Sequence, residues 1–389
     1  MFRRIVVLVM DSVGIGEQPD AVQYISQGAN TFRHAASAVT GFSVPNLQRL
    51  GLGNIPGVVD VPSTPTPLAH FGRMVETTSG NDTFAGIWEM GGVIFTERFE
   101  SYNPGIPSDV VQQLQDSIGM GTLCNAYVSG FRVYDMYADE HFETRKPIIY
   151  TNDDGVVLIG AHEDVIPPAK MHEIARQMTR FFTGKRITRI IGRAFVGTKG
   201  NFIRTENRID IAVPLDKNQV HLYRRLRERG TGFTVTEHLA SIIGEEFPTR
   251  ILKGIKDSTG VMAWVNDLLD TDEPGVSMFV VPDFDMSGHK RDAVGYGKDI
   301  VAFDTMLGGT LKRIGKDDLL LITADHGCDP VLPIRGHTRE YVPLLVLNGN
   351  HRTGSDLGTR HTFADLGQTI CDLVGAEPIE VGTSFASQL

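Results

Sequence analysis

Three short acidic segments hold the residues of this sequence whose types and spacing could carry out chemistry. They supply an aspartate, an aspartate followed by a histidine, and an aspartate-histidine pair followed by a second histidine: Asp11, Asp285 with His289, and Asp325-His326 with His337. Carboxylates and imidazoles are common ligands of divalent metal ions, and this set is large enough to hold two of them. Two divalent ions in an α/β protein are typical of phosphate or sulfate ester chemistry.

Each acidic segment directly follows a run of apolar, mostly β-branched residues, at 5–10, 276–281 and 319–323. These runs, and a fourth at 343–347, predict fully buried, parallel strands. Helical patterns alternate with the later strands, at 297–313 and 363–374. We therefore expect a doubly wound, mostly parallel α/β sheet with helices on both faces. Ligands of such sheets bind at the carboxyl ends of the strands, where the acidic segments fall.

The length of the chain, 389 residues, is too great for one typical hydrophobic core. Between 97 and 214 the strand patterns are shorter and more alternating, and one helical stretch stands among them at 167–182. This change of pattern predicts an inserted α+β cap domain at 97–214. Residues 1–96 and 215–389 would then form the two parts of a core domain, the second with most of the metal ligands.

The composition argues against several classes of partner. A net charge of −10 argues against nucleic acid, and no apolar run is long enough to cross a membrane. The three cysteines, Cys124, Cys328 and Cys371, are scattered, which suits a reducing cytoplasm rather than a disulfide framework. An acidic protein can still bind a small phosphorylated substrate if local cations or metal ions attract it. The oligomeric state stays open.

Each candidate residue also has a simpler structural interpretation. Asp11 could cap the turn that follows its strand, and Asp325 could do the same while His326 forms an ordinary hydrogen bond. A single histidine is more often structural than a metal ligand. If Asp325 and His326 do share an ion, a carboxylate beside an imidazole suits Mn²⁺ or Zn²⁺ better than Mg²⁺ or Ca²⁺, which prefer oxygen ligands.

Two glycine-containing segments bear on phosphate binding. A Gly-Ile-Gly sequence at 14–16 invites a dinucleotide-binding interpretation, but Pro19 occupies the place of the third glycine, so we reject it. Thr83 stands in a glycine-flanked segment, 79–86. Its hydroxyl could meet phosphate at a helix start, and a bound metal would make it a nucleophile. Local sequence alone favours a plain N-cap threonine at this position.

Several specific segments resemble the bacterial phosphopentomutase family of the alkaline phosphatase superfamily: 10–16, 50–55, Trp88-Glu89, 195–202, 319–327 and 337–345. The similarity runs over nearly the whole chain. It implies an alkaline-phosphatase-like core with a cap inserted after about residue 95. It also implies isomerase activity in nucleoside and pentose phosphate metabolism.

The resemblance further implies the residues of the site. Two Mn²⁺ ions would be bound by two sets of residues: Asp285, His289 and His337, and Asp11, Asp325 and His326. Thr83 would lie between the ions and carry a phosphoryl group. By position, four cap residues match the sugar-phosphate subsite of the family: Asn152, Asp154, Arg193 and Arg208. Two of these are arginines, which bind phosphate through two hydrogen bonds at once.

The implied reaction moves a phosphoryl group within one sugar. Phospho-Thr83 would donate its phosphoryl group to a ribose or deoxyribose phosphate and give a bisphosphate. The sugar would reorient, and Thr83 would take back the other phosphate. The cap must exclude water during this exchange, because water would hydrolyse the phosphothreonine.

The chain departs from the family pattern near the reactive centre. Ala85 and Ile87 stand where the family has Thr and His, Gly336 replaces an Asp, and His238 aligns near a substrate-contacting Lys. These changes leave the exact sugar open. The alternatives are a dimetal phosphohydrolase, a mutase acting on a different phosphorylated small molecule, and a metal-binding protein without catalytic activity.

The second acidic segment is one residue shorter than in the family. Only Met286 and Ser287 separate Asp285 from Gly288, where the family places three residues. Either Asp283 or Asp285 could therefore be the metal ligand, and the sequence leaves this choice open.

Overall fold

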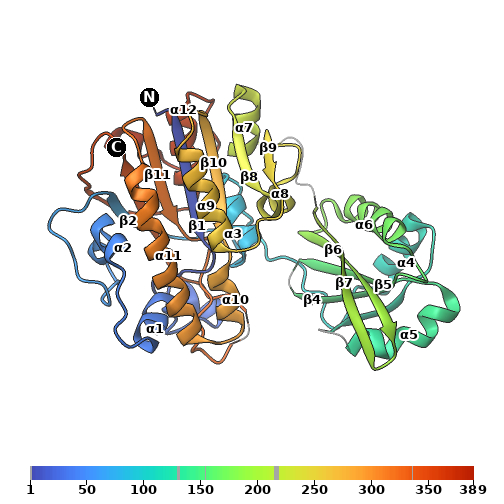
Figure 1. Ribbon diagram of the computed structural model, residues 1–389. Coiled ribbons are helices and arrows are strands. Elements are labelled where there is room, and N and C mark those ends of the chain that lie inside the picture. Colours follow the sequence, from blue (N-terminus) through green and yellow to red (C-terminus); the bar gives the residue numbers. More distant parts are fainter. Residues whose placement is uncertain (1, 129–131, 154, 214–218, 335) are drawn as a thin grey trace. The chain divides into compact units, whose positions relative to one another are not determined.

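The computed structural model describes residues 2–128, 132–153, 155–213, 219–334 and 336–389. The contacts between its residues divide the protein into two compact units (Figure 1). Unit 1 comprises Met1–Thr96 and Val220–Leu389, and unit 2 comprises Glu97–Gln219. The domain boundary expected between 214 and 215 lies outside the described residues.

A sheet of eight strands, counted over the described residues, forms the middle layer of unit 1. Their spatial order is β13 (Asp356–Arg360), β2 (His70–Met74), β12 (Val342–Asn348), β11 (Asp318–Thr323), β1 (Arg4–Met10), β10 (Gly275–Val281), β8 (Phe233–Thr236) and β9 (Arg250–Leu252). All of them run parallel to β1 except β12. The mostly parallel sheet predicted from the sequence is therefore confirmed.

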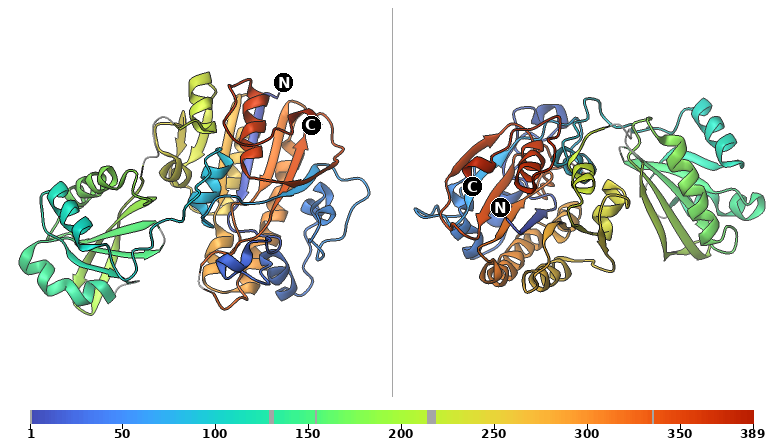
Figure 2. Two further views of the ribbon diagram at one scale, coloured as in Figure 1. Left: turned by 180° about the vertical axis from the view of Figure 1, so that it is seen from behind. Right: turned by 90° about the horizontal axis from the view of Figure 1, so that it is seen from above.

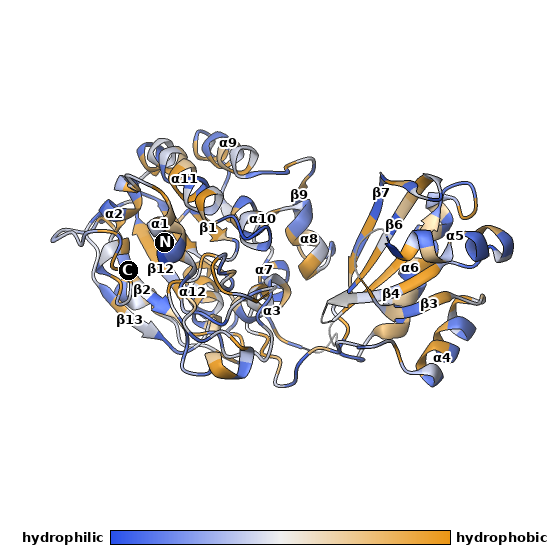
Figure 3. Cartoon of the chain, turned by 90° about the horizontal axis from the view of Figure 1, so that it is seen from below, coloured by the Kyte–Doolittle hydropathy of each residue, from blue (hydrophilic) through white to orange (hydrophobic). Residues whose placement is uncertain are grey.

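Helices cover both faces of this sheet (Figure 2). One layer holds α1 (Thr31–Ala38), α2 (Pro45–Leu50), α9 (Ser258–Leu269), α10 (Asp283–His289) and α11 (Ala293–Arg313). The other holds α3 (Thr83–Met90), α7 (Leu222–Arg229) and α12 (Ala364–Val374), and α8 (Glu237–Ile243) contacts α3. Figure 3 shows α9 and α11 on one side of β1 and α3, α7 and α12 on the other. This double cover explains why β1, β11 and β12 are buried along their whole length.

The strand expected at 343–347 is β12, and its expected parallel direction is wrong. β12 lies antiparallel to both β11 and β2. An all-apolar run indicates burial on both faces but says nothing about direction. No helix occurs between β11 and β12 in the described part of the chain, and an antiparallel neighbour, unlike a parallel one, needs no crossover helix.

Unit 2 is a smaller α+β structure with its own core. Its five described strands lie in chain order: β3 (Leu123–Tyr127), β4 (Ile148–Asp153), β5 (Val156–His162), β6 (Arg189–Thr198) and β7 (Asn201–Ala212). Helices α4 (Ser108–Ile118) and α6 (Pro168–Phe182) share one apolar cluster with the sheet, and α5 (Arg132–Thr144) shares another. The sequence pattern indicated only α6. The pattern missed α4 because this helix buries only Leu114 and Ile118.

Three short 3₁₀ helices complete the described elements of unit 1: η1 (Ala21–Tyr24), η2 (Leu52–Asn54) and η3 (Ala386–Gln388). Within the described residues, every helix is too short or too polar to cross a membrane.

Candidate metal centre

The carboxyl ends of three neighbouring strands bring the acidic segments together. β1 pairs in parallel with β10 and with β11, and Met10 lies beside Val281. Asp11 follows β1 directly, α10 follows β10, and Asp325-His326 come shortly after β11. Because these strands are buried and lie side by side in parallel, the polar residues that follow them gather at one edge of the sheet.

Asp11, Asp325 and His326 form the most buried group, and their ligand atoms lie within 4.8 Å of one another. His326 Nε2 is 3.5 Å from Asp11 Oδ1 and 3.6 Å from Asp325 Oδ2. The N–H of Ser12 donates to Asp325 Oδ1 at 3.0 Å, whereas Oδ2 accepts no hydrogen bond from any described residue. A buried carboxylate oxygen without a donor is costly, so this oxygen fits a cation.

Asp285, His289 and His337 form a second group, and His326 links it to the first. His289 Nε2 is 3.2 Å from Asp285 Oδ2, and His337 Nε2 is 3.5 Å from Asp285 Oδ1. The Nε2 atoms of His289 and His337 lie 3.2 Å apart. Asp285, His326 and His337 again offer ligand atoms within 4.8 Å of one another. Imidazole nitrogens that converge on one carboxylate fit a divalent cation of the Mn²⁺ or Zn²⁺ type.

Helix α10 orients Asp285, and not Asp283, toward the histidines. Asp285 and His289 are four residues apart on this helix and therefore lie on one face. Asp283 instead accepts a hydrogen bond from the N–H of Ser258, at the start of α9. Burial raises the pKa of Asp285, but its contacts with His289 and His337 outweigh burial and hold the pKa below its ordinary value.

Burial sets the pKa values of the first group. Burial, aided by the charges of Asp325 and Asp285, raises the pKa of Asp11 well above its ordinary value. Burial also raises the pKa of Asp325 to about 7. It lowers the pKa of His326 well below its ordinary value, so this imidazole is neutral near pH 7. The neutral imidazole is the form that binds a metal ion, whereas the raised pKa values of Asp11 and Asp325 mean that a divalent ion must displace their protons when it binds.

Thr83 reaches the same centre from the start of α3. Its Oγ1 lies 3.1 Å from His326 Nε2 and donates to Asp11 Oδ1 at 3.4 Å. The plain N-cap interpretation of Thr83 is wrong, because Asp82 caps the helix by accepting from the N–H of Ala85. The Thr83 hydroxyl is therefore directed to the candidate ligands and not to its own helix.

Gly86 allows α3 to approach the centre closely. A Cβ atom at this position would lie 2.4 Å from the backbone oxygen of Asp325. Any larger residue would push the helix and the strand end apart, so Gly86 sets the distance between Thr83 and the metal-binding residues.

Arg339 holds the segment that leads to Thr83, and the sequence reasoning missed it. Its guanidinium donates to the backbone oxygens of Glu76, Thr78 and Gly80. It also forms ion pairs with Glu76 at 2.9 Å and Asp20 at 3.1 Å. The available signal was its place three residues before the buried strand β12, where a charged residue needs a buried partner.

Glu340 holds the loop after Asp11 in place by hydrogen bonds. Its carboxylate accepts from the N–H of Gly16 and from both the N–H and the hydroxyl of Thr31. Burial raises the pKa of Glu340, and the hydrogen bonds from Thr31 oppose this shift. Arg339 and Glu340 thus hold in place the segment before Thr83 and the loop after Asp11.

The whole chain aligns with curated phosphopentomutases. It is 38% identical over 390 residues to the phosphopentomutase of Acetivibrio thermocellus, with 100% of both chains covered. It is 36% identical over 394 residues to that of Caldanaerobacter subterraneus, with 100% of this chain and 98% of the relative covered. The chain belongs to the phosphopentomutase family.

A family model described as the Metalloenzyme superfamily matches residues 235–378, which include every candidate ligand except Asp11. Divalent metal binding therefore follows from the family as well as from the grouped ligands. Among solved structures, phosphoglycerate mutase of Leishmania mexicana aligns with a TM-score of 0.48 and 12% identity, covering 99% of this chain and 97% of that chain.

The departures from the phosphopentomutase pattern in α3 fall on buried positions. Ala85 and Ile87, which replace Thr and His, are both 0% exposed. Glu89, which the pattern retains, accepts hydrogen bonds from the N–H groups of Thr77 and Thr78. These bonds hold the segment before Thr83, and Thr83 keeps its contacts with His326 and Asp11 despite the two replacements.

Two further departures lie outside the ligand groups. Gly336, which replaces an Asp of the phosphopentomutase pattern, has a φ angle of +114°, a conformation that favours glycine. His238, which aligns near a substrate-contacting Lys, is exposed on α8. Neither residue belongs to a group of possible metal ligands among the described residues.

The expected sugar-phosphate residues lie in unit 2. Arg193 and Arg208 are cross-strand partners on β6 and β7. Burial, with the charges of Arg208 and Arg204, lowers the pKa of Arg193, and Arg193 Nε has no hydrogen-bond partner among the described residues. Asp154 lies outside the described residues, and Asn152 is described only as part of β4. Clustered guanidinium groups of this kind fit a phosphate.

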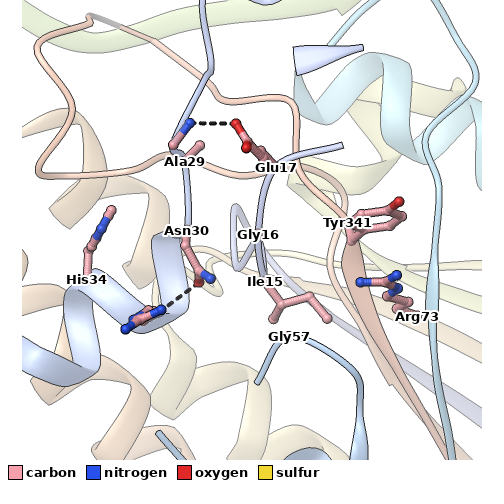
Figure 4. A pocket seen from close by; sticks show the side chains of 11 residues that line it. Ile15, Gly16, Glu17, Ala29, Asn30, His34, Gly57, Arg73 and Tyr341 are labelled. Carbon is pink, nitrogen blue, oxygen red and sulfur yellow. Dashed lines mark hydrogen bonds between the residues drawn. The ribbon is translucent and has the colours of Figure 1, made fainter. Parts of the chain in front are cut away.

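A cavity of about 360 Å³ lies beside the loop that follows Asp11 (Figure 4). Its lining includes Ile15, Glu17, Asn30, His34, Arg73 and Tyr341. The guanidinium of Arg73 stacks on the ring of Tyr341 at 3.9 Å. The lining holds no candidate metal ligand among the described residues, so this cavity is not the metal centre.

Proposed function

We propose that this chain interconverts the 1-phosphate and the 5-phosphate of ribose or deoxyribose through a phosphothreonine at Thr83. Its family membership makes it a metal-dependent isomerase that transfers a phosphoryl group on a pentose phosphate. The observation that carries the proposal is the position of Thr83 Oγ1, 3.1 Å from His326 Nε2 and 3.4 Å from Asp11 Oδ1. A hydroxyl held in this way is suited to attack phosphorus.

We take the metal ions to be two Mn²⁺, held by two sets of residues: Asp285, His289 and His337, and Asp11, Asp325 and His326. Asp285 Oδ1 and Asp325 Oδ2 are buried and accept no hydrogen bond from any described residue, which supports this assignment. Carboxylates mixed with imidazoles suit Mn²⁺ better than Mg²⁺ or Ca²⁺. When bound, such ions neutralise charge on the transferring group and make the threonine hydroxyl more acidic.

The chain's own residues then carry out two matching transfers. In the first, the bond from phosphorus to Thr83 Oγ1 breaks as a bond to the free sugar hydroxyl forms, and the proton of that hydroxyl ends on Thr83. In the second, the reoriented sugar bisphosphate gives its other phosphoryl group to Thr83 Oγ1, which returns a proton to the sugar oxygen. Asp11 and His326 hold Oγ1 in place for both transfers.

We propose that Asn152, Asp154, Arg193 and Arg208 form the sugar-phosphate subsite. The pairing of Arg193 with Arg208 across two strands supports a role in binding phosphate. Unit 2 would act as the cap that keeps water from phospho-Thr83. Three free cysteines support our further proposal that the protein works in the cytoplasm.

Peptide mass spectrometry after incubation with a sugar bisphosphate tests this proposal. We expect one added phosphate on Thr83, none on Thr83→Ala, and one on Thr83→Ser, which retains a hydroxyl. Thr83→Ala should lose activity by a factor on the order of 10³ or more while it still binds metal. A phosphate on another residue, or normal turnover by Thr83→Ala, would exclude the covalent mechanism.

A further inference from the structure

Cys328 is a buried thiol at the edge of the candidate metal centre, and the proposed reaction does not use it. It lies two residues after His326 and is 2% exposed. Its Sγ, a carboxylate oxygen of Asp285 and a ring nitrogen of His289 lie within 4.8 Å of one another. These three side chains offer three different kinds of ligand atom to one point.

The packing of α10 brings the thiol to this point. A Cβ atom on Gly288 would lie 2.6 Å from Cys328 Sγ, so only a glycine allows this turn of the helix to rest on the thiol. The same turn carries Asp285 and His289. The thiol contacts Asp285 and donates to the backbone oxygen of Gly336 at 3.7 Å, a weak contact that a metal could replace.

A sulfur ligand beside Asp285 and His289 changes which metal ions this position prefers. Thiolates bind Zn²⁺ and Co²⁺ well, whereas Mn²⁺ is usually held by oxygen and nitrogen. We propose that Cys328 is a ligand of the ion held by Asp285 and His289, and that it biases this position toward thiophilic cations. On binding, the thiol proton passes to solvent as the metal–sulfur bond forms. The inference rests on the metal centre of the proposed function and adds one ligand to it.

Cobalt binding tests the inference by a signal that does not depend on activity. Wild-type protein titrated with Co²⁺ should show the near-ultraviolet charge-transfer absorption of a sulfur–cobalt bond. Cys328→Ser should bind Co²⁺ without this absorption, and its preference for Zn²⁺ over Mn²⁺ should fall by about tenfold or more. Cys371→Ser is the matched control, because Cys371 is buried on α12 and belongs to no possible ligand group among the described residues.

X-ray absorption of the zinc-loaded wild type provides a test that needs no variant. A sulfur neighbour at about 2.3 Å is expected if Cys328 is a ligand. Bound zinc or cobalt with only nitrogen and oxygen neighbours would overturn the cysteine ligand and leave the proposed function standing. Failure of the wild type to bind either ion would overturn both. A charge-transfer signal that persists in Cys328→Ser would also overturn the inference.

Discussion

Thr83 is the residue on which the proposed chemistry depends, because its hydroxyl contacts both Asp11 and His326. Its own helix does not use this hydroxyl, since Asp82 supplies the cap. A side chain freed from capping and held against two candidate ligands is suited to become a nucleophile when metal is present.

Replacing single aspartates tests the ligand assignment at α10. Asp285→Ala should reduce the bound metal from two ions to one, because it removes the carboxylate that His289 and His337 contact. Asp283→Ala is the matched control two residues away and should keep both ions, since Asp283 contacts Ser258. Elemental analysis of the purified variants counts the metals. Two ions in Asp285→Ala and one in Asp283→Ala would reverse the assignment.

The pKa of Asp325 predicts how metal binding depends on pH. Since burial raises this pKa to about 7, the metal-free carboxyl still holds its proton at pH 6. Metal must displace that proton, so affinity should rise with pH through about 7, by roughly tenfold per pH unit for each proton released, and Asp11, whose pKa burial also raises, should add to this rise. His326 adds no proton because its pKa is lowered. Calorimetry in buffers of different ionisation enthalpy counts the protons, and none released at pH 6 would contradict this expectation.

At the scale of the elements, the close approach of α3 to the end of β11 sets the position of Thr83 beside the candidate ligands. Gly86→Ala should lower activity by about tenfold or more, because the new Cβ would displace Thr83 from His326. It should also cost about 1–3 kcal/mol of unfolding free energy through overpacking.

Gly309→Ala on α11 is the matched control for Gly86→Ala. Its Cβ would meet nothing closer than 3.7 Å, so stability should rise slightly and activity should stay unchanged. Thermal unfolding and steady-state kinetics report the two effects. Equal activity in both variants would show that the close approach at Gly86 does not position Thr83.

Apolar runs predicted the strand ends that carry Asp11, Asp285 and Asp325, because such runs indicate burial and the next polar residue marks an edge. They could not predict the direction of β12, since burial on both faces is the same for either direction. They also could not identify Arg339, whose partners Glu76 and Gly80 are more than 250 residues away in the sequence.

At the scale of the whole molecule, one chain builds two units with separate cores. Unit 1 holds Thr83 and all candidate ligands, and unit 2 holds Arg193 and Arg208. In the proposed reaction, phosphoryl transfer would occur at Thr83, and Arg193 and Arg208 would bind the sugar phosphate. The sequence predicted an insertion from shorter strand patterns, but β6 and β7 are 10 and 12 residues long, and the role of unit 2 as a cap stays a prediction.

The most direct test of the central claim is a phosphorus NMR time course. Mn²⁺-loaded protein would be mixed with ribose 1-phosphate and a trace of a sugar bisphosphate. We predict that the signal of the 1-phosphate converts to that of the 5-phosphate without free phosphate, and that Thr83→Ala abolishes the conversion. Growth of free phosphate in place of the 5-phosphate would contradict the mutase and identify a hydrolase, and an unchanged spectrum would exclude ribose 1-phosphate as the substrate.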